Sequence, residues 1–329
     1  MGTLYLRVGY KYLMISPQVS IIMPAFNAER YIEEAVNSVI NQTFKDWELI
    51  IINDGSTDGT EIIAGKYIAA DSRVKLINQE NKKLGAARNT GIVSAKGGWI
   101  AFLDADDLWV PDKLEKQLFA AQTNPGAGVV FSDGFTFYDD AIKTALPYGT
   151  VTGPLTASAI YKLEYQGNYI PVLSVIVKKK HIDAIGLQDV DPCIYGCEDW
   201  DYWLRLAIHG VPFYGMNDKL FYYRKHSSGM SNDYDLMNLA KATVFIKNFR
   251  KELLSKQDIF RISNFINLTI CSFISLGKIK EALFLNRRMN SISKSVLRKT
   301  GSFFINTFGS RSYYPVRLVF KVNSLFKLY

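Results

Sequence analysis

The sequence has few cysteines, no apolar run long enough to cross a membrane, and no internal repeat. Cys193, Cys197 and Cys271 are its three cysteines, and an odd, sparse set argues against a disulfide framework and for a reducing compartment. No stretch reaches the roughly 18 uncharged apolar residues of a membrane-spanning helix. Residues 1–17 contain no apolar run of signal-peptide length. These absences argue against a small disulfide-rich secreted domain, and they predict a cytoplasmic protein.

Positive charge is concentrated towards one end of the chain. The formal net charge is +8, yet residues 231–329 hold 17 Lys or Arg against 5 Asp or Glu, and residues 1–230 are slightly acidic. Aromatic residues are interleaved with these cations, a mixture that suits helices lying on an anionic membrane surface. A helical cap whose aromatics pack on the preceding domain would have the same composition. We expect a basic helical region over 232–329 and leave both alternatives open, the cap and a peripheral position on the inner face of the cell membrane.

Short β-rich runs alternate with amphipathic stretches between Val19 and Asp107. The runs are almost continuously apolar, which is typical of parallel strands buried on both faces. The alternation predicts an α/β fold, with an open, mostly parallel sheet flanked by helices. The predicted strands are 19–24, 47–53, 73–78 and 98–104, and the predicted helices are 28–41, 57–70 and 84–96. Later in the chain we predict helices at 111–123 and 197–208, strands at 127–134, 173–177 and 219–224, and an irregular segment over 135–170.

Acidic and amide residues follow three of the predicted strands, as PAFNAE (24–29), NDGSTD (53–58) and DADD (104–107). Ligands of open α/β sheets bind beyond the carboxyl ends of the strands. A carboxylate there can accept the imide N–H of a nucleotide base, and Asp104-x-Asp106 offers the hard oxygen ligands that Mg²⁺ or Mn²⁺ prefers. Each motif alone is also explained as a turn or a helix N-cap.

The order of six motifs is more specific than any one of them. PAFNAE, NDGSTD, GAARNTG (85–91), LDADD, CEDWDYWLRL (197–206) and YRKHSSGMS (223–231) follow one another as in the family 2 glycosyltransferases of bacterial surface polysaccharides, and the chain resembles that family from Val19 to Ser231. The resemblance implies a GT-A fold. It divides the chain into an N-terminal extension (1–17), a GT-A glycosyltransferase domain (18–231) and the basic helical region (232–329).

The resemblance also implies a role for individual residues and a divalent cation, Mn²⁺ or Mg²⁺, as cofactor. Asp199 matches the catalytic base, and Glu198 lies beside it; an inverting displacement needs such a base opposite the leaving diphosphate. The implied metal residues are Asp104, Asp106 and His226, and the implied nucleotide-sugar residues are Pro24, Ala25, Asn27, Glu29, Asp54, Arg88, Asp104 and Ala105. One departure is Lys82-Lys83, where relatives usually carry glycines, and it leaves the contacts of that loop in doubt.

The resemblance implies transfer of a sugar from a nucleotide diphosphate donor, for which we expect a UDP-sugar, to a saccharide or lipid-linked acceptor. A nucleotidyltransferase could have a similar sheet and metal site, but PAFNAE lacks the glycine-rich basic loop that a triphosphate requires. A non-catalytic sugar-nucleotide-binding protein would have lost the base or a metal ligand, and all are present. The acidic strand ends disfavour a nucleic-acid partner.

Overall fold

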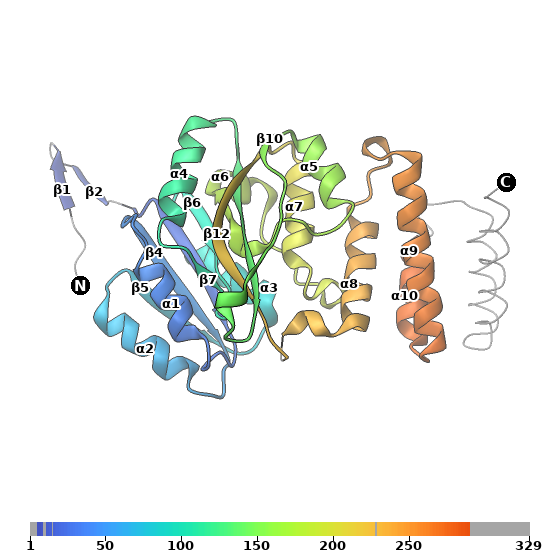
Figure 1. Cartoon of the computed structure of the whole chain (residues 1–329), viewed down its shortest axis with the longest axis horizontal. Coiled ribbons are helices and arrows are strands. Elements are labelled where there is room, and N and C mark those ends of the chain that lie inside the picture. Colours follow the sequence, from blue (N-terminus) through green and yellow to red (C-terminus); the bar gives the residue numbers. More distant parts are fainter. Residues whose placement is uncertain (1–4, 9–10, 15, 228, 290–329) are drawn as a thin grey trace. The chain divides into compact units, whose positions relative to one another are not determined.

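The computed structural model describes residues 5–8, 11–14, 16–227 and 229–289 (Figure 1). The described residues fall into two compact units. The first comprises the residues up to Val190 together with Glu198–Asn232, and the second comprises Asp191–Cys197 with the residues from Asp233 onward. The second unit thus includes a short segment that lies within the range 18–231. Each unit is described by itself below.

A mixed sheet of ten strands forms the centre of the first unit (Figure 1). Its main path runs in the order β10 (Gly153–Leu155), β12 (Phe213–Lys225), β8 (Val129–Tyr138), β11 (Val175–Lys178), β6 (Trp99–Phe102), β3 (Val19–Ala25), β4 (Trp47–Asp54), β5 (Val74–Gln79), while β7 (Leu108–Trp109) pairs with β12 and β9 (Leu146–Pro147) with β8. The strands β6, β3, β4 and β5 are parallel, as the alternation of strands and helices predicts. The other half is mixed, because β11 is antiparallel to both β6 and β8.

Helices cover both faces of the parallel half of the sheet. Successive side chains of a strand point to opposite faces, and β3 and β4 are buried at every position, so both faces are covered. Ile21 of β3 belongs to one buried cluster with Ile32 and Leu114. On the opposite face, a Cβ added to Gly91 would lie 2.5 Å from Cγ2 of Ile22, so glycine is needed for this close approach. The helices of this unit are α1 (Ile32–Ile40), α2 (Thr60–Ala70), α3 (Lys83–Ser94), α4 (Lys113–Thr123), α5 (Ala157–Glu164), α6 (Lys179–Ile185) and α7 (Glu198–Ile208).

Two segments differ from the sequence-based expectation. Strand β5 is the edge of the sheet, and most of its residues after Val74 are partly exposed, so it is not buried on both faces. The segment 135–170 is more regular than expected: β8 continues to Tyr138, and α5 begins after Thr156, whose hydroxyl accepts the Ala159 N–H as an N-cap. The first difference follows from sheet order, which periodicity does not report.

Helix α7 is held by two buried tryptophans. The Trp203 indole N–H donates to the Ile170 carbonyl (2.9 Å), and the Trp200 indole N–H donates to the Glu164 carbonyl (2.7 Å). Both side chains are buried, so Trp200 and Trp203 pack in the core of this unit. Cys197, just before the helix, is also buried.

The second unit is helical, with η3 (Pro192–Ile194), α8 (Tyr234–Lys247), α9 (Lys256–Ser275) and α10 (Ile279–Met289). Ser255 and Asp258 form a reciprocal capping box that starts α9. Helix α9 contacts both neighbours, and the Phe245 and Phe265 rings lie 5.8 Å apart edge to face. Part of the aromatic content of this region therefore packs within the unit.

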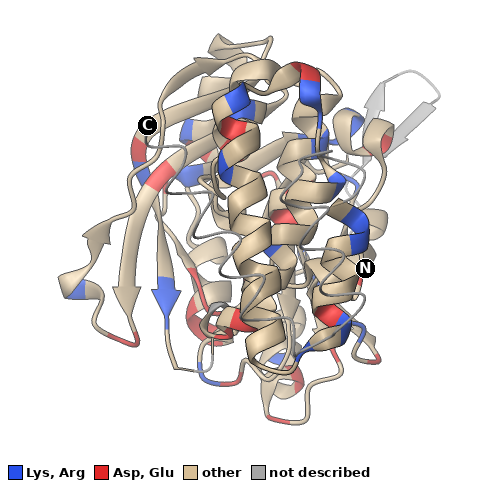
Figure 2. Cartoon of the chain, turned by 90° about the vertical axis from the view of Figure 1, so that its right-hand side faces the viewer, with Lys and Arg blue, Asp and Glu red and all other residues tan. Residues whose placement is uncertain are grey.

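The charged residues of the second unit are compatible with both alternatives, a helical cap and a helical region on a membrane surface. Its described residues hold 10 Lys or Arg and 6 Asp or Glu, and the charged residues of α9 are confined to its first two turns (Figure 2). Residues 290–329, with seven cations and no acid, lie outside the described residues. Among the helices that are described, none is long and apolar enough to span a bilayer.

The N-terminal residues form a separate two-stranded sheet. Strand β1 (Tyr5–Val8) pairs antiparallel with β2 (Lys11–Met14), and among the described strands neither joins the ten-stranded sheet. An isolated two-stranded hairpin is only marginally stable. It therefore contributes little to the stability of the first unit.

Deleting residues 1–13 should leave the thermal melting temperature and the specific activity unchanged, because among the described strands β1 and β2 pair with each other and not with the ten-stranded sheet. Differential scanning fluorimetry and an activity assay on the shortened and full-length proteins would check this. A clear drop in either property would show that the hairpin supports the catalytic unit.

Candidate active site

The loops that follow β3 and β4 are hydrogen-bonded to each other. Asn27, which has a left-handed φ of 49°, accepts the Thr57 N–H on Oδ1 (2.8 Å). The Glu29 N–H donates to Asp58 Oδ2 (3.0 Å), and Glu29 Oε2 accepts the Gly59 N–H (2.8 Å). Two predicted nucleotide-sugar residues thus shape the rim of the site, and their contact with a nucleoside stays a prediction.

Three further predicted residues are small and buried. Pro24 and Ala25 end β3, and Ala105 lies in the turn after β6. Their side chains have no polar atoms, so each could meet a donor only through its backbone or by leaving room for it.

Asp54 is held at the end of β4 with one oxygen engaged. Its Oδ1 accepts the Gln79 side-chain N–H (2.6 Å) and the Lys82 backbone N–H (2.9 Å), and the residue is buried. Among the described residues, no hydrogen bond to Oδ2 is found. The carboxylate therefore keeps one acceptor for an N–H from outside the protein. The Lys82 and Lys83 side chains are exposed.

Arg88 joins the metal-binding and catalytic candidates into one cluster. Its buried guanidinium donates through Nη2 to both Asp104 oxygens (2.8 and 2.9 Å). Burial acts to lower the pKa of Arg88, but the carboxylates of Asp104, Asp199 and Glu198 outweigh it and raise that pKa. Three predicted acids from two distant segments therefore share one cation. The tertiary structure thus brings the Asp104 turn and the α7 N-terminus to the same edge of the sheet.

Asp106 pairs with His226 across 120 residues of sequence. His226 Nε2 lies 3.0 Å from Asp106 Oδ2, and the Tyr31 ring lies 4.9 Å from the imidazole. Asp107 accepts the Arg224 backbone N–H on Oδ1 (2.8 Å), and burial, followed by the charges of the neighbouring acids, raises the pKa of Asp107 well above its usual range. Asp107 therefore supports the turn, and Asp106 is the acid that faces the histidine.

The Asp106–His226 pair fits a divalent cation, whereas Asp104 is engaged elsewhere. Two adjacent ligands of an octahedral ion at about 2.1 Å lie about 3 Å apart, which is the separation of Asp106 Oδ2 and His226 Nε2. Both Asp104 oxygens are bonded to Arg88, and no group of three or more His, Cys, Asp or Glu side chains among the described residues is placed to hold a metal. A bound ion would thus take two protein ligands and fill its other positions with diphosphate oxygens and water, as Mg²⁺ commonly does.

Asp199 lies in the first turn of α7, and an asparagine that the sequence did not single out lies against it. Asn168 Nδ2 lies 3.3 Å from each Asp199 oxygen. Burial raises the pKa of Asp199 above its ordinary value, although Arg88 and Asn168 act to lower it. A carboxylate with a raised pKa is a stronger base than an exposed aspartate and is suited to remove a hydroxyl proton.

Two more residues near Asp199 were missed by the sequence analysis. Glu164 at the end of α5 is fully buried, accepts the Tyr169 N–H (3.2 Å), and has a pKa raised well above its usual range by burial. Burial, followed by the charges of Asp199 and Glu164, also raises the pKa of Tyr148, whose ring contacts the Phe221 ring. Tyr148, Glu164 and Asn168 all lie in the segment 135–170, which carries none of the six motifs, so only the fold reveals them.

The neighbours of Asp199 on α7 have different surroundings. Asp201 is buried and pairs with Arg205 one turn later (3.7 Å). Glu198 is buried against Gly85 of α3, where a Cβ would lie 3.2 Å from Glu198 Cγ. The Asp201 carboxylate therefore pairs within α7, while the Glu198 carboxylate is one of the acids around Arg88.

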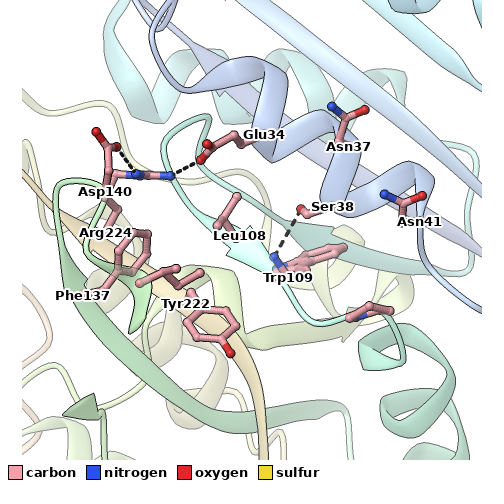
Figure 3. Close-up of a pocket in the computed structure, with 12 residues that line it drawn as sticks. Glu34, Asn37, Ser38, Asn41, Leu108, Trp109, Phe137, Asp140, Tyr222 and Arg224 are labelled. Carbon is pink, nitrogen blue, oxygen red and sulfur yellow. Dashed lines mark hydrogen bonds and ion pairs between the residues drawn. The ribbon is translucent and has the colours of Figure 1, made fainter. Parts of the chain in front are cut away.

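A cavity of about 450 Å³ lies beside this site and not within it. Glu34, Trp109, Tyr222 and Arg224 are among its lining residues, and none of the predicted donor residues is (Figure 3). The rings of Phe221 and Tyr223 contact Tyr148, whereas Tyr222 faces the cavity. Since successive side chains of a strand alternate, β12 separates the cavity from the Asp199 side.

Comparisons with known proteins show the family of this chain. Residues 20–149 match the family Glycosyl transferase family 2. TuaG of Bacillus subtilis (strain 168), named as a glycosyltransferase of teichuronic acid biosynthesis, is 35% identical over 232 residues, which cover 70% of this chain and 87% of TuaG. WfgD of Escherichia coli, named as a UDP-Glc:α-D-GlcNAc-diphosphoundecaprenol β-1,3-glucosyltransferase, is 46% identical over 101 residues, or 30% of this chain and 39% of WfgD.

A solved structure shows the same fold. The crystal structure of S. aureus TarS 1–349 in complex with UDP-GlcNAc superimposes with a TM-score of 0.64, covering 93% of this chain and 92% of that one. The sequences are 18% identical. The predicted GT-A architecture is thereby confirmed.

Removing the metal ion, or its proposed ligand Asp106, should abolish sugar transfer without unfolding the protein. We expect EDTA to stop activity and Mn²⁺ or Mg²⁺ to restore it. Asp106→Ala should lose activity yet melt at nearly the wild-type temperature, because its side chain is 35% exposed and contributes little packing. Asp218→Ala, an exposed aspartate in an ion pair with Lys116, is the control and should remain active. Full activity in EDTA would show that transfer needs no divalent cation and would contradict the metal assignment.

Asn168→Ala should move the acidic limb of the kcat/KM profile to higher pH. The base acts when deprotonated, so activity is lost as the pH falls through its pKa, and Asn168 acts to lower that pKa. The plateau kcat should fall no more than about tenfold, the order of one hydrogen bond. Gln166→Ala, an exposed residue in the same turn, should leave the profile in place. An unshifted limb in Asn168→Ala would mean that Asn168 does not act on the base.

Proposed function

Because this chain belongs to glycosyl transferase family 2 and is a glycosyltransferase, we propose that it transfers a sugar with inversion from a UDP-sugar to a hydroxyl of a saccharide or lipid-linked acceptor. The observation that carries the proposal is the cluster around Arg88. It places a candidate base, Asp199, near the turn that carries Asp106, the candidate metal ligand.

The donor nucleoside is proposed to lie at the ends of β3 and β4. Asp54 Oδ2 can accept the imide N–H of uracil while Oδ1 remains bonded to Gln79 and Lys82. The imide alone does not distinguish uracil from thymine. The choice of UDP is supported by WfgD, whose name specifies UDP-Glc, and by TarS, which was solved with UDP-GlcNAc.

Asp199 is proposed to act as the general base. It would take the proton of the acceptor hydroxyl while the new bond forms at the anomeric carbon and the bond to the diphosphate breaks, releasing UDP. Arg88 holds positive charge beside Asp199 and Asp104, so it favours the ionised form of the base. Asn168 orients the carboxylate through both of its oxygens.

Asp106 and His226 are proposed to hold the divalent cation, which would supply a Lewis acid for the charge building on the leaving diphosphate. Asp104 supports this turn through Arg88 and is proposed to contribute indirectly. Glu198 is proposed to act beside the base by adding to the negative charge around Arg88 from the α7 side.

The acceptor is proposed to approach from the side of Tyr148 and Asn168, where Asp199 lies. TuaG and WfgD are named for teichuronic acid biosynthesis and for a diphosphoundecaprenol-linked acceptor, which supports a role in bacterial polysaccharide biosynthesis. Contact with a membrane surface stays a prediction, since seven of the 17 cations of the basic region fall within 290–329, outside the described residues.

A panel of UDP-, dTDP- and GDP-sugars, incubated with the protein and Mn²⁺, tests the donor. We expect hydrolysis or transfer from a UDP-sugar with release of UDP, and ¹H NMR of the transfer product should show the inverted anomeric configuration. Release of pyrophosphate from a nucleoside triphosphate would instead favour the nucleotidyltransferase alternative. Retention of configuration at the anomeric carbon would contradict the single-displacement mechanism.

Asp199→Asn tests the base within the same assay. It should lower kcat by about 10²–10⁴-fold while UDP affinity, measured by calorimetry, stays near wild type, because the proton is taken only in the transition state. Asp201→Asn is the matched control and should keep most of the turnover of the folded protein. The opposite pattern in the two variants would move the base to Asp201.

A further inference from the structure

The side chain of Arg224 in β12 is 1% exposed yet bonded to several parts of the fold. Its Nη1 donates to the Asp139 carbonyl (2.5 Å) and to Asp140 Oδ1 (3.0 Å), and its Nη2 donates to Glu34 Oε2 (2.5 Å). Figure 3 shows the guanidinium lying between the Glu34 and Asp140 carboxylates. A buried cation is thereby compensated by acceptors from α1 and from the segment after β8.

The same residue holds the turn that carries the candidate metal ligand. Arg224 Nε donates to the Asp106 backbone carbonyl (2.8 Å), and the Arg224 backbone N–H donates to Asp107 Oδ1 (2.8 Å). His226 follows two residues later on the same chain segment. Arg224 is thus hydrogen-bonded to the backbone of Asp106 and lies two residues before His226 in the chain.

Aromatic rings enclose the guanidinium on two sides. The Arg224 Cζ lies 4.7 Å from the centre of the Tyr31 ring and 4.6 Å from that of Phe137. The Tyr31 ring also contacts the imidazole of His226, at 4.9 Å between centres. The guanidinium therefore fixes Tyr31, and Tyr31 in turn limits where the imidazole can lie.

We infer that Arg224 is a positioning residue of the metal site: it sets the 3.0 Å spacing of Asp106 Oδ2 and His226 Nε2 and thereby the affinity for the cation. The inference rests on the proposed function. A lysine could not replace it, because the donors of an ammonium group sit on one nitrogen. They cannot reach the four acceptors that three guanidinium nitrogens bond here, and an ammonium group has no plane to stack between two rings.

Binding of Mn²⁺ to protein with UDP, followed through the EPR signal of the free ion, tests this without an activity assay. We expect Arg224→Met and Arg224→Lys each to raise the dissociation constant for Mn²⁺ by about 10–100-fold, as loss of outer-sphere support commonly does. In turnover assays, the Mn²⁺ concentration for half-activation should rise similarly, while kcat at saturating Mn²⁺ falls much less. A general loss of structure would lower kcat at every Mn²⁺ concentration.

Arg30→Met is the matched control. Arg30 also lies over Tyr31 (5.0 Å) and also pairs with Asp140 (2.9 Å), but its side chain is 60% exposed and no hydrogen bond links it to Asp106 or Asp107 among the described residues. Its removal should leave Mn²⁺ binding within twofold of wild type. A folded Arg224→Met with wild-type Mn²⁺ affinity would overturn the inference.

A second variant covers failure of the arginine variants to fold. Glu34→Ala combined with Asp140→Ala keeps Arg224 but removes its two anionic partners, which are 61% and 70% exposed and add little packing. A weaker affinity for Mn²⁺ in this double variant supports the inference, and an unchanged affinity contradicts it. If the wild-type protein itself binds no Mn²⁺ with UDP, the proposed metal site fails; if it binds and the variants bind equally well, only the role of Arg224 fails.

Discussion

The rest of the site depends on the ionic interaction between the buried guanidinium of Arg88 and the carboxylates around it. Carboxylates from the turn after β6 and from the start of α7 would repel one another if brought together without it, and a buried charge is stable only when it is paired. Arg88 bonds directly to Asp104 and lies close to Glu198 and Asp199. It thus allows the turn of the proposed metal ligand Asp106 and the proposed base Asp199 to share one edge of the sheet.

Each half of this edge has its own support, and β12 lies between them. On one side, Tyr148 packs against Phe221 and faces the region of Asp199, whose carboxylate is oriented by Asn168. On the other side, Arg224 ties Asp106 to the neighbouring segments. Alternation of side chains along one strand therefore supports the proposed acceptor side and the proposed metal side separately.

The sequence predicted the elements and the strand-end residues well because their signals are local. Apolar runs, helical periodicity and turn residues are properties of a few neighbouring positions, and the order of motifs located Asp54, Asp106 and Asp199 in the chain. The edge position of β5 and the regular structure within 135–170 could not be read in this way. Both depend on which strands and helices become neighbours, which local periodicity does not contain.

The sequence by itself determined the fold class, the family and the chemical kinds of group available at the strand ends. Only the tertiary structure decided how they are used. It turned Asp104 towards Arg88, left Asp106 facing His226, and gave Asn27 and Glu29 the task of joining two loops. It also added Asn168 and Glu164 to the surroundings of Asp199. The physical reason is that these contacts join residues far apart in the chain, and their energies depend on burial and distance, which exist only once the sheet and its helices have assembled.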